Sequence, residues 1–118
     1  MTPKQATLET YALLKAFKLN DWLVLVIDPT ALATLNGSPT EPNGDPIQGL
    51  CCFRLKTIFL SEEYCKIGQQ AWQLIEHECS HALSGESECK NNPRFSDAEK
   101  RIDSFYRAAE LGTEPEKP

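Results

Sequence analysis

The sequence predicts a single small domain in which helices pack against a short sheet around one modest core. Its length of 118 residues suits one domain and leaves no room for a separate recognition domain. Three stretches repeat apolar residues at helical spacings of three and four. Three shorter runs are rich in the β-branched and aromatic residues that favour strands. Helices and strands are therefore expected along one chain, without an internal repeat.

The first elements are expected to be an amphipathic helix and a buried strand. Residues 6–19 place their apolar side chains on one helical face, and Asn20 can end that helix. The run Trp-Leu-Val-Leu-Val-Ile at 22–27 predicts a largely buried strand, and Asp28-Pro29 is typical of a turn that closes it.

A long loop is expected over residues 28–49. This segment holds four prolines and three glycines, so little regular structure should persist beyond one turn near residues 30–35. Long loops in small domains are often functional. The loop is either a tolerated surface insertion or the rim of a functional cleft.

The middle of the chain predicts a hairpin followed by a long helix. Residues 50–53 and 56–60 have strand composition, and Arg54-Leu55 can connect them. Ser61 with two acids after it resembles a helix start. The apolar spacing from Lys66 then predicts a helix to about Ser84, with Gly85 as its stop.

The last helix is expected to begin at Ser96 and to end at Gly112. Pro93 prevents the preceding helix from continuing, and Ser96 and Glu99 have the spacing of a capping box. Residues 113–118 should form a solvated tail, so the domain is expected to span residues 1–112.

Composition excludes some classes of partner. A formal net charge of -5 and a pI near 5.0, without a cluster of Lys and Arg, argue against nucleic acid. Residues 1–20 lack the features of a signal peptide, and the run at 22–27 is too short to cross a bilayer. We therefore expect a soluble, cytoplasmic protein without a membrane partner. An odd count of five cysteines without a C-x-x-C pair predicts reduced, mostly buried thiols.

The motif with the clearest chemistry is His-Glu-x-x-His at residues 77–81, which contains both histidines of the chain. Residues four apart lie on one face of a helix, so His77 and His81 can direct ring nitrogens at one Zn²⁺ ion. Glu78 is then placed to take a proton from a water in the open coordination position. The motif therefore predicts a zinc centre for hydrolysis.

A catalytic zinc normally has a third protein ligand, and the last helix offers candidates. Glu99 can complete a His₂Glu set, while Asp103, one turn further, can accept the other ring N–H of a ligand histidine. Each has an alternative role. Glu99 fits the capping box with Ser96, and Asp103 can pair with Arg107 four residues on.

Cys79 and Cys89 offer a rival zinc site, because thiolates bind zinc well. Cys79 projects about 200° around the helix from His77, so its sulfur faces away from a metal held by the histidines. Cys79 is therefore interpreted as a buried structural thiol.

The chain resembles the small gluzincin-type zinc metallopeptidases that bacterial viruses and mobile elements encode, relatives of the ImmA/IrrE and SprT-like groups. The resemblance is carried by the strand at 56–61, His-Glu-x-x-His-Ala-Leu at 77–83 and Glu-x-x-x-Asp at 99–103. The chain lacks the further histidine of SprT-like proteins. It has Ser80 where ImmA-like proteins usually have glycine, and Ile102 where they have alanine.

The resemblance implies His77, His81 and Glu99 as zinc ligands, Glu78 as the general base, and Asp103 as the carboxylate that orients a ligand histidine. It also implies an α+β zincin-like domain. An N-terminal helix and a small, mostly antiparallel sheet would pack on the motif helix and a C-terminal helix.

The function expected from this resemblance is zinc-dependent hydrolysis of a peptide bond in a protein target, such as a host or prophage regulator. The oxyanion would need a second donor, for which Tyr64 and Tyr106 are the available phenols. Two alternatives stay open. A catalytically silent zinc domain could bind or inhibit a host protein, or the motif could be a chance match in a metal-free domain.

Overall fold

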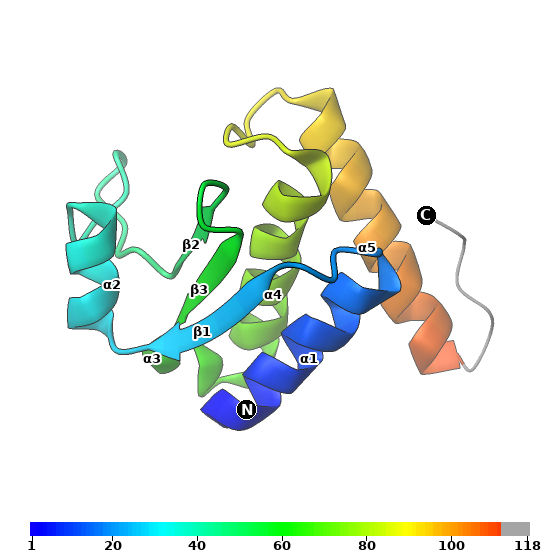
Figure 1. Ribbon diagram of the computed structural model, residues 1–118, viewed down its shortest axis with the longest axis horizontal. Coiled ribbons are helices and arrows are strands. Elements are labelled where there is room, and N and C mark those ends of the chain that lie inside the picture. The colour runs from blue at the N-terminus through cyan, green and yellow to red at the C-terminus, as the bar shows by residue number, and fades with distance from the viewer. Residues whose placement is uncertain (112–118) are drawn as a thin grey trace.

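The computed structural model describes residues 1–111 and places them in five helices and three strands (Figure 1). In chain order these are α1 (Pro3–Ala16), β1 (Leu23–Ile27), α2 (Pro29–Asn36), β2 (Gly49–Cys52), β3 (Thr57–Ser61), α3 (Glu62–Cys65), α4 (Gly68–Ser84) and α5 (Pro93–Leu111). The α+β class is thereby confirmed. The predicted helix end at Gly112 and the tail at 113–118 lie outside the described residues.

The three strands form a mixed sheet in the order β1-β3-β2. β2 pairs antiparallel with β3 through the predicted hairpin, whose strand limits are correct to within one residue. β1 pairs parallel with β3, from Leu23 opposite Thr57 to Ile27 opposite Ser61. The expected mostly antiparallel sheet is therefore wrong. Parallel strands need a long crossover connection, and here α2 and β2 form the connection between β1 and β3.

Helix α2 occupies part of the segment expected to be a loop. Asp28 is its N-cap, with a carboxylate that accepts the Ala31 N–H at 2.9 Å, and Pro29 is its first residue. Gly37 ends it in the left-handed conformation, at φ 81°. The prediction of a loop over 28–49 is corrected to an eight-residue helix followed by a shorter connection to β2.

Strand β1 is less buried than expected, because it lies at one edge of the sheet. Its Val24 side chain is buried, whereas Leu23 and Leu25 are 56% and 50% exposed. Those two leucines lie on the same face as Ile27, which packs against the cluster of Leu32 and Phe59, but they are not part of that cluster. The prediction of a largely buried strand is wrong for that face.

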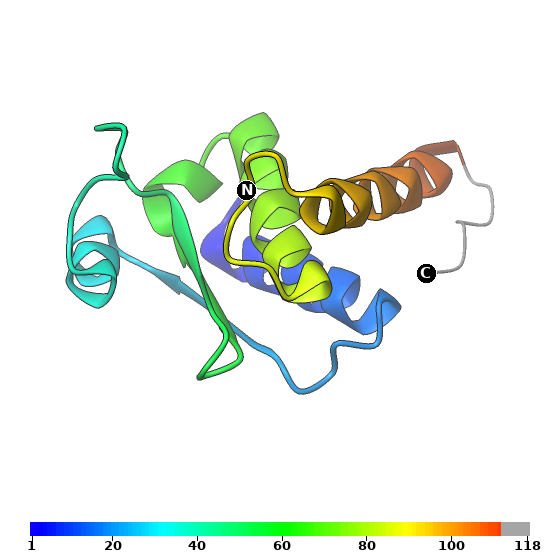
Figure 2. The same cartoon turned by 90° about the horizontal axis from the view of Figure 1, so that it is seen from above.

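The core lies between the sheet and the helices α1 and α4. All five residues of the central strand β3 are buried, since helices cover both of its faces. Helix α5 packs on α4 away from the sheet, so α4 lies between the sheet and α5 (Figure 2). This arrangement buries two sides of the helix that carries the His-Glu-x-x-His motif.

The helix limits follow local capping chemistry. α1 begins earlier than predicted, because Thr2 and Gln5 form a capping box. α4 ends at Ser84 as predicted, with Gly85 at φ 72°. α5 begins at Pro93, and the Ser96 N–H donates within the helix to the Asn92 carbonyl at 3.0 Å. The capping-box interpretation of Ser96 and Glu99 is therefore wrong.

Among the described helices, none combines the length and apolar character needed to cross a lipid bilayer.

Candidate metal centre

The two motif histidines converge on one point beside α4. His77 and His81 are one helical turn apart, and their Nε2 atoms are 3.2 Å from each other. Two nitrogens that bind one zinc tetrahedrally, with bonds near 2.0–2.1 Å, would be about 3.4 Å apart. The metal-free pair therefore already has nearly the spacing that a shared zinc ion requires.

Glu78 completes a compact group with these histidines. Among the side chains that the structure describes, in residues 1–108, His77, Glu78 and His81 form the one group of three or more possible metal ligands whose ligand atoms all lie within 4.8 Å of one another. Two neighbouring imidazoles suit a first-row transition metal such as zinc, and the Glu78 carboxyl lies beside the position that such an ion would take. The residues present therefore fit a metal ion.

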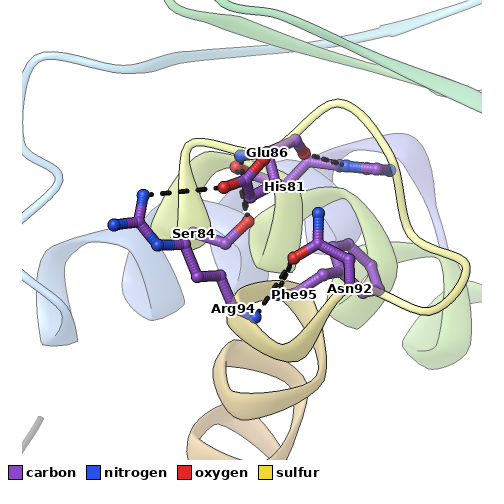
Figure 3. A network of polar contacts seen from close by, with 6 residues as sticks. All are labelled: His81, Ser84, Glu86, Asn92, Arg94 and Phe95. Carbon is purple, nitrogen blue, oxygen red and sulfur yellow. Dashed lines mark hydrogen bonds and ion pairs between the residues drawn. The ribbon is translucent and has the colours of Figure 1, made fainter.

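A backbone hydrogen bond sets the proton position on His81. Its Nδ1 lies 2.7 Å from the carbonyl oxygen of Glu86. A dashed line marks this contact in Figure 3. A carbonyl can only accept, so Nδ1 carries the hydrogen and Nε2 keeps its lone pair. That lone pair is the one a metal needs, and Nε2 is the atom near His77.

Phe95 at the start of α5 packs against both imidazoles. Its ring centroid is 5.3 Å from that of His77 and 4.7 Å from that of His81. Burial lowers the pKa of His77 below its ordinary value, and the positive charge of a protonated His81 nearby lowers it further by a smaller amount. A lowered pKa keeps this imidazole neutral, which is its metal-binding form.

Glu78 is a buried carboxyl group without a polar partner. It is 4% exposed, and in the part of the chain that the structure describes no hydrogen bond reaches it. Burial, with a smaller contribution from Glu41, raises its pKa to about 8. Its Oε2 lies over Gly49 at the start of β2, where a Cβ atom would be only 2.8 Å away. Glycine therefore makes room for the carboxyl.

An open cavity of about 840 Å³ adjoins the three residues. The connection between α2 and β2 lines it through residues 41–43 and 45–48, β2 through residues 49–51, and the loop between α4 and α5 through residues 87–90. Of the two interpretations of the 28–49 segment, these positions favour the rim of a cleft. The cavity is within the size range of ligand sites.

Glu99 is not a member of the group that His77, Glu78 and His81 form. It is half-buried on α5, one turn beyond Phe95, which touches both histidines. Burial raises the pKa of Glu76, and the charges of Asp103 and Glu99 raise it further. Both α5 carboxylates therefore lie near Glu76, the residue before His77. Glu99 as third ligand stays a prediction.

Asp103 has a partner on its own helix. Its Oδ2 is 2.9 Å from Arg107 Nε, the pairing weighed as its alternative role. The acceptor for His81 Nδ1 is instead the Glu86 carbonyl. Sequence reasoning missed this acceptor, although Gly85 after the last helical residue was a signal that the chain turns back there. A role for Asp103 in orienting a ligand remains a prediction.

The cysteines and tyrosines occupy different surroundings. Cys79 is buried in the core, as predicted, while Cys51 and the exposed Cys89 line the cavity. In the described part of the chain, the cavity lining includes neither Tyr64 nor Tyr106, the two candidate oxyanion donors. Neither phenol is therefore placed at the site in this structure.

No protein-family model, curated protein or solved structure matches this chain.

Gly49→Ala is expected to destabilise the protein by about 1–3 kcal/mol, the usual range for overpacking. The new Cβ would be 2.8 Å from Glu78 Oε2 and Leu74 Cδ1, and 3.0 Å from the Phe59 carbonyl oxygen. Urea unfolding measures the change. Gly68→Ala is the matched control, since a Cβ there meets nothing within 4 Å. Equal stability of both variants would show that Glu78 is not held against β2.

Glu78→Gln is expected to alter the pH dependence of stability in the metal-free protein. The folded state holds the Glu78 proton more tightly than the unfolded chain, since its pKa rises from 4.5 to about 8. Wild-type stability should therefore fall as pH rises between those two values, and Gln removes this loss. The unfolding free energy of the variant relative to the wild type should be higher at pH 9 than at pH 4 by on the order of 5 kcal/mol. Parallel curves of unfolding free energy against pH would contradict a buried, unpartnered carboxyl.

Proposed function

We propose that this chain is a zinc-dependent peptidase with a zincin-like domain, and that His77, Glu78 and His81 form its centre. The observation that carries the proposal is the convergence of the two Nε2 atoms at 3.2 Å beside a buried carboxyl at an open cavity. A helix-borne pair of histidines with an intervening glutamate is the arrangement of metal-dependent hydrolases.

The zinc would be held by Nε2 of His77 and of His81, with Glu99 as the proposed third ligand. When bound, zinc supplies a Lewis acid that polarises a water molecule and the carbonyl of the substrate. The Glu86 carbonyl keeps the lone pair of His81 on Nε2. Phe95 covers both rings and excludes water from that side.

Glu78 would move the proton. In peptide hydrolysis the oxygen of a water molecule bonds to the carbonyl carbon, and the carbon–nitrogen bond breaks. The Glu78 carboxylate takes a proton from that water and returns it to the leaving amine. Because Gly49 lies against the carboxyl and no hydrogen bond in the described part of the chain engages it, Glu78 is free to accept and release this proton.

The cavity suits an extended peptide with basic side chains. Its charged lining, besides Glu78, consists of Glu41, Asp45 and Glu88 with one lysine, Lys90. A cleft of net negative charge attracts cationic groups and repels acidic ones. A protein target, such as the regulators on which the resembled peptidases act, would then be cut near Lys or Arg.

A zinc-stapled binding domain without catalysis is the second candidate. The observation that favours it is the exposed pair Leu23 and Leu25 on the edge strand β1, because exposed apolar edges mark contact surfaces. Such a domain would tolerate Glu78→Gln, whereas a peptidase would not.

Zinc content and cleavage together test the peptidase. The purified protein should hold one zinc per chain by elemental analysis and should cut a proteome-derived peptide mixture, as read by mass spectrometry. Glu78→Gln should keep the zinc and lower kcat/KM by at least about 100-fold. Glu99→Ala should weaken zinc binding by at least about tenfold, and Asp97→Ala, an exposed acid on the same helix, should not. A protein purified without zinc that takes up none on titration rules the proposal out.

Cleavage sites should be enriched in Lys and Arg within a few residues of the cut bond. Glu88→Gln is expected to reduce this enrichment several-fold, because it removes one of the three acidic groups of the rim. Glu9→Gln is the control, since this exposed residue on α1 is outside the cavity lining. The same cleavage sites for both variants would mean that the rim charge does not select the substrate.

A further inference from the structure

We propose that residues 84–95, which connect α4 to α5, form a strap that holds His81 in its metal-binding tautomer. The inference rests on the proposed metal site and adds positioning residues to it, namely Ser84, Glu86 and Arg94. Figure 3 shows these side chains around His81, together with Asn92 and Phe95.

The strap begins with a reversal of the chain at Gly85. This residue has φ 72°, a conformation that glycine adopts at low cost, and its N–H donates to the His81 carbonyl at 2.9 Å. The reversal carries Glu86 back over the last turn of α4. Its carbonyl oxygen thereby reaches His81 Nδ1 at 2.7 Å.

Ser84 holds the two ends of this reversal together. Its hydroxyl oxygen accepts the Glu86 N–H at 3.1 Å, and the hydroxyl lies 3.3 Å from the His81 carbonyl, to which it donates. The three polar parts of Glu86 thus have three different partners. Its N–H donates to Ser84, its carbonyl accepts from His81, and its carboxylate pairs with Arg94. Ser84 therefore fixes the backbone that presents the acceptor to His81.

The other end of the strap is attached to α5. The Glu86 carboxylate is 3.6 Å from Arg94 Nη1. The Asn92 side chain accepts the N–H groups of Arg94 and Phe95, at 3.1 and 3.2 Å, which starts α5 at this point. Phe95 in turn packs on the His81 ring, with 4.7 Å between centroids. The imidazole is therefore held both by a hydrogen bond and by a ring that the strap positions.

The consequence of these contacts is chemical. A neutral imidazole has one N–H, and the hydrogen bond at one nitrogen decides which nitrogen keeps the lone pair. With Nδ1–H on the Glu86 carbonyl, Nε2 of His81 keeps its lone pair, which accepts a hydrogen bond from Nε2–H of His77 at 3.2 Å in the metal-free protein. The strap thus performs for His81 the orienting role that the resemblance assigns to Asp103. It does so with an uncharged acceptor.

The test reads the tautomer directly in the metal-free protein, by nitrogen-15 NMR of the histidine rings. His81 should be the Nδ1–H form in the wild type. In Ser84→Ala and in Arg94→Gln the Nε2–H form should become measurable, and the dissociation constant for zinc should rise about 3- to 10-fold. Ser84→Thr should restore both readouts, since it keeps the hydroxyl.

Two controls separate the strap from general effects on α5. Arg107→Gln removes an ion pair of the same kind on α5, to Asp103, and should leave the His81 tautomer and zinc affinity unchanged. Asp103→Asn should likewise leave the His81 tautomer unchanged. A shift of that tautomer in Asp103→Asn would overturn the proposal.

Two further results would overturn the strap. One is a wild-type His81 in the Nε2–H form. The other is weaker zinc binding in Ser84→Ala and Arg94→Gln with an unchanged tautomer, which would indicate a merely structural role. Because the tautomer is read without metal, the two proposals fail separately. A protein that binds no zinc but holds His81 as Nδ1–H would refute the peptidase and support the strap.

Discussion

Burial of a polar turn of α4 is the constraint on which the rest of the structure depends. Glu78, Ser80 and His81 are all buried where α4 lies between the sheet and α5. Buried polar groups cost free energy unless they are hydrogen-bonded. The Ser80 hydroxyl donates to the Glu76 carbonyl at 2.6 Å, and His81 donates to the Glu86 carbonyl. Two of the three groups are therefore satisfied by backbone oxygens, one inside the helix and one beyond its end. Glu78 is the member that finds no such partner.

The sheet topology provides the space that this unpartnered carboxyl occupies. Parallel pairing with β1 and antiparallel pairing with β2 put β3 in the centre of the sheet and β2 at an edge. α4 crosses β2 at Gly49, where the absence of a side chain lets the Glu78 carboxyl lie against the strand. A larger residue there would push on both Glu78 and Leu74. The position of the carboxyl thus depends on a strand that is near in space but about thirty residues away in sequence.

Elements with a local signal were predictable, and the errors share a physical origin. The hairpin, the end of α4 at Gly85 and the pairing of His77 with His81 all follow from residues within a few positions of one another. Asp28-Pro29 is typical of a turn after a strand, and Pro93 prevents the preceding helix from continuing, yet each proline is the first residue of a helix, where its missing N–H has no cost. The parallel partner of β1 and the setting of Glu99 depend on how distant elements pack, which a periodic pattern does not specify. The Glu86 carbonyl is a backbone group, so no residue type marks it as the acceptor for His81.

The hydrogen bonding of the buried polar groups also distinguishes a catalytic zinc site from one that only stabilises the fold, here called a staple. A staple needs ligands and the contacts that orient them, and both histidines with the Glu86 carbonyl would satisfy that need. It does not need a largely buried acid that lines the cavity without a protein hydrogen bond, nor a glycine in a strand to accommodate that acid. Both features lower stability, and both are explained if Glu78 must accept and release a proton beside the metal. Features that a fold tolerates at a cost are expected at functional sites. The unpartnered carboxyl therefore favours chemistry over a purely structural zinc.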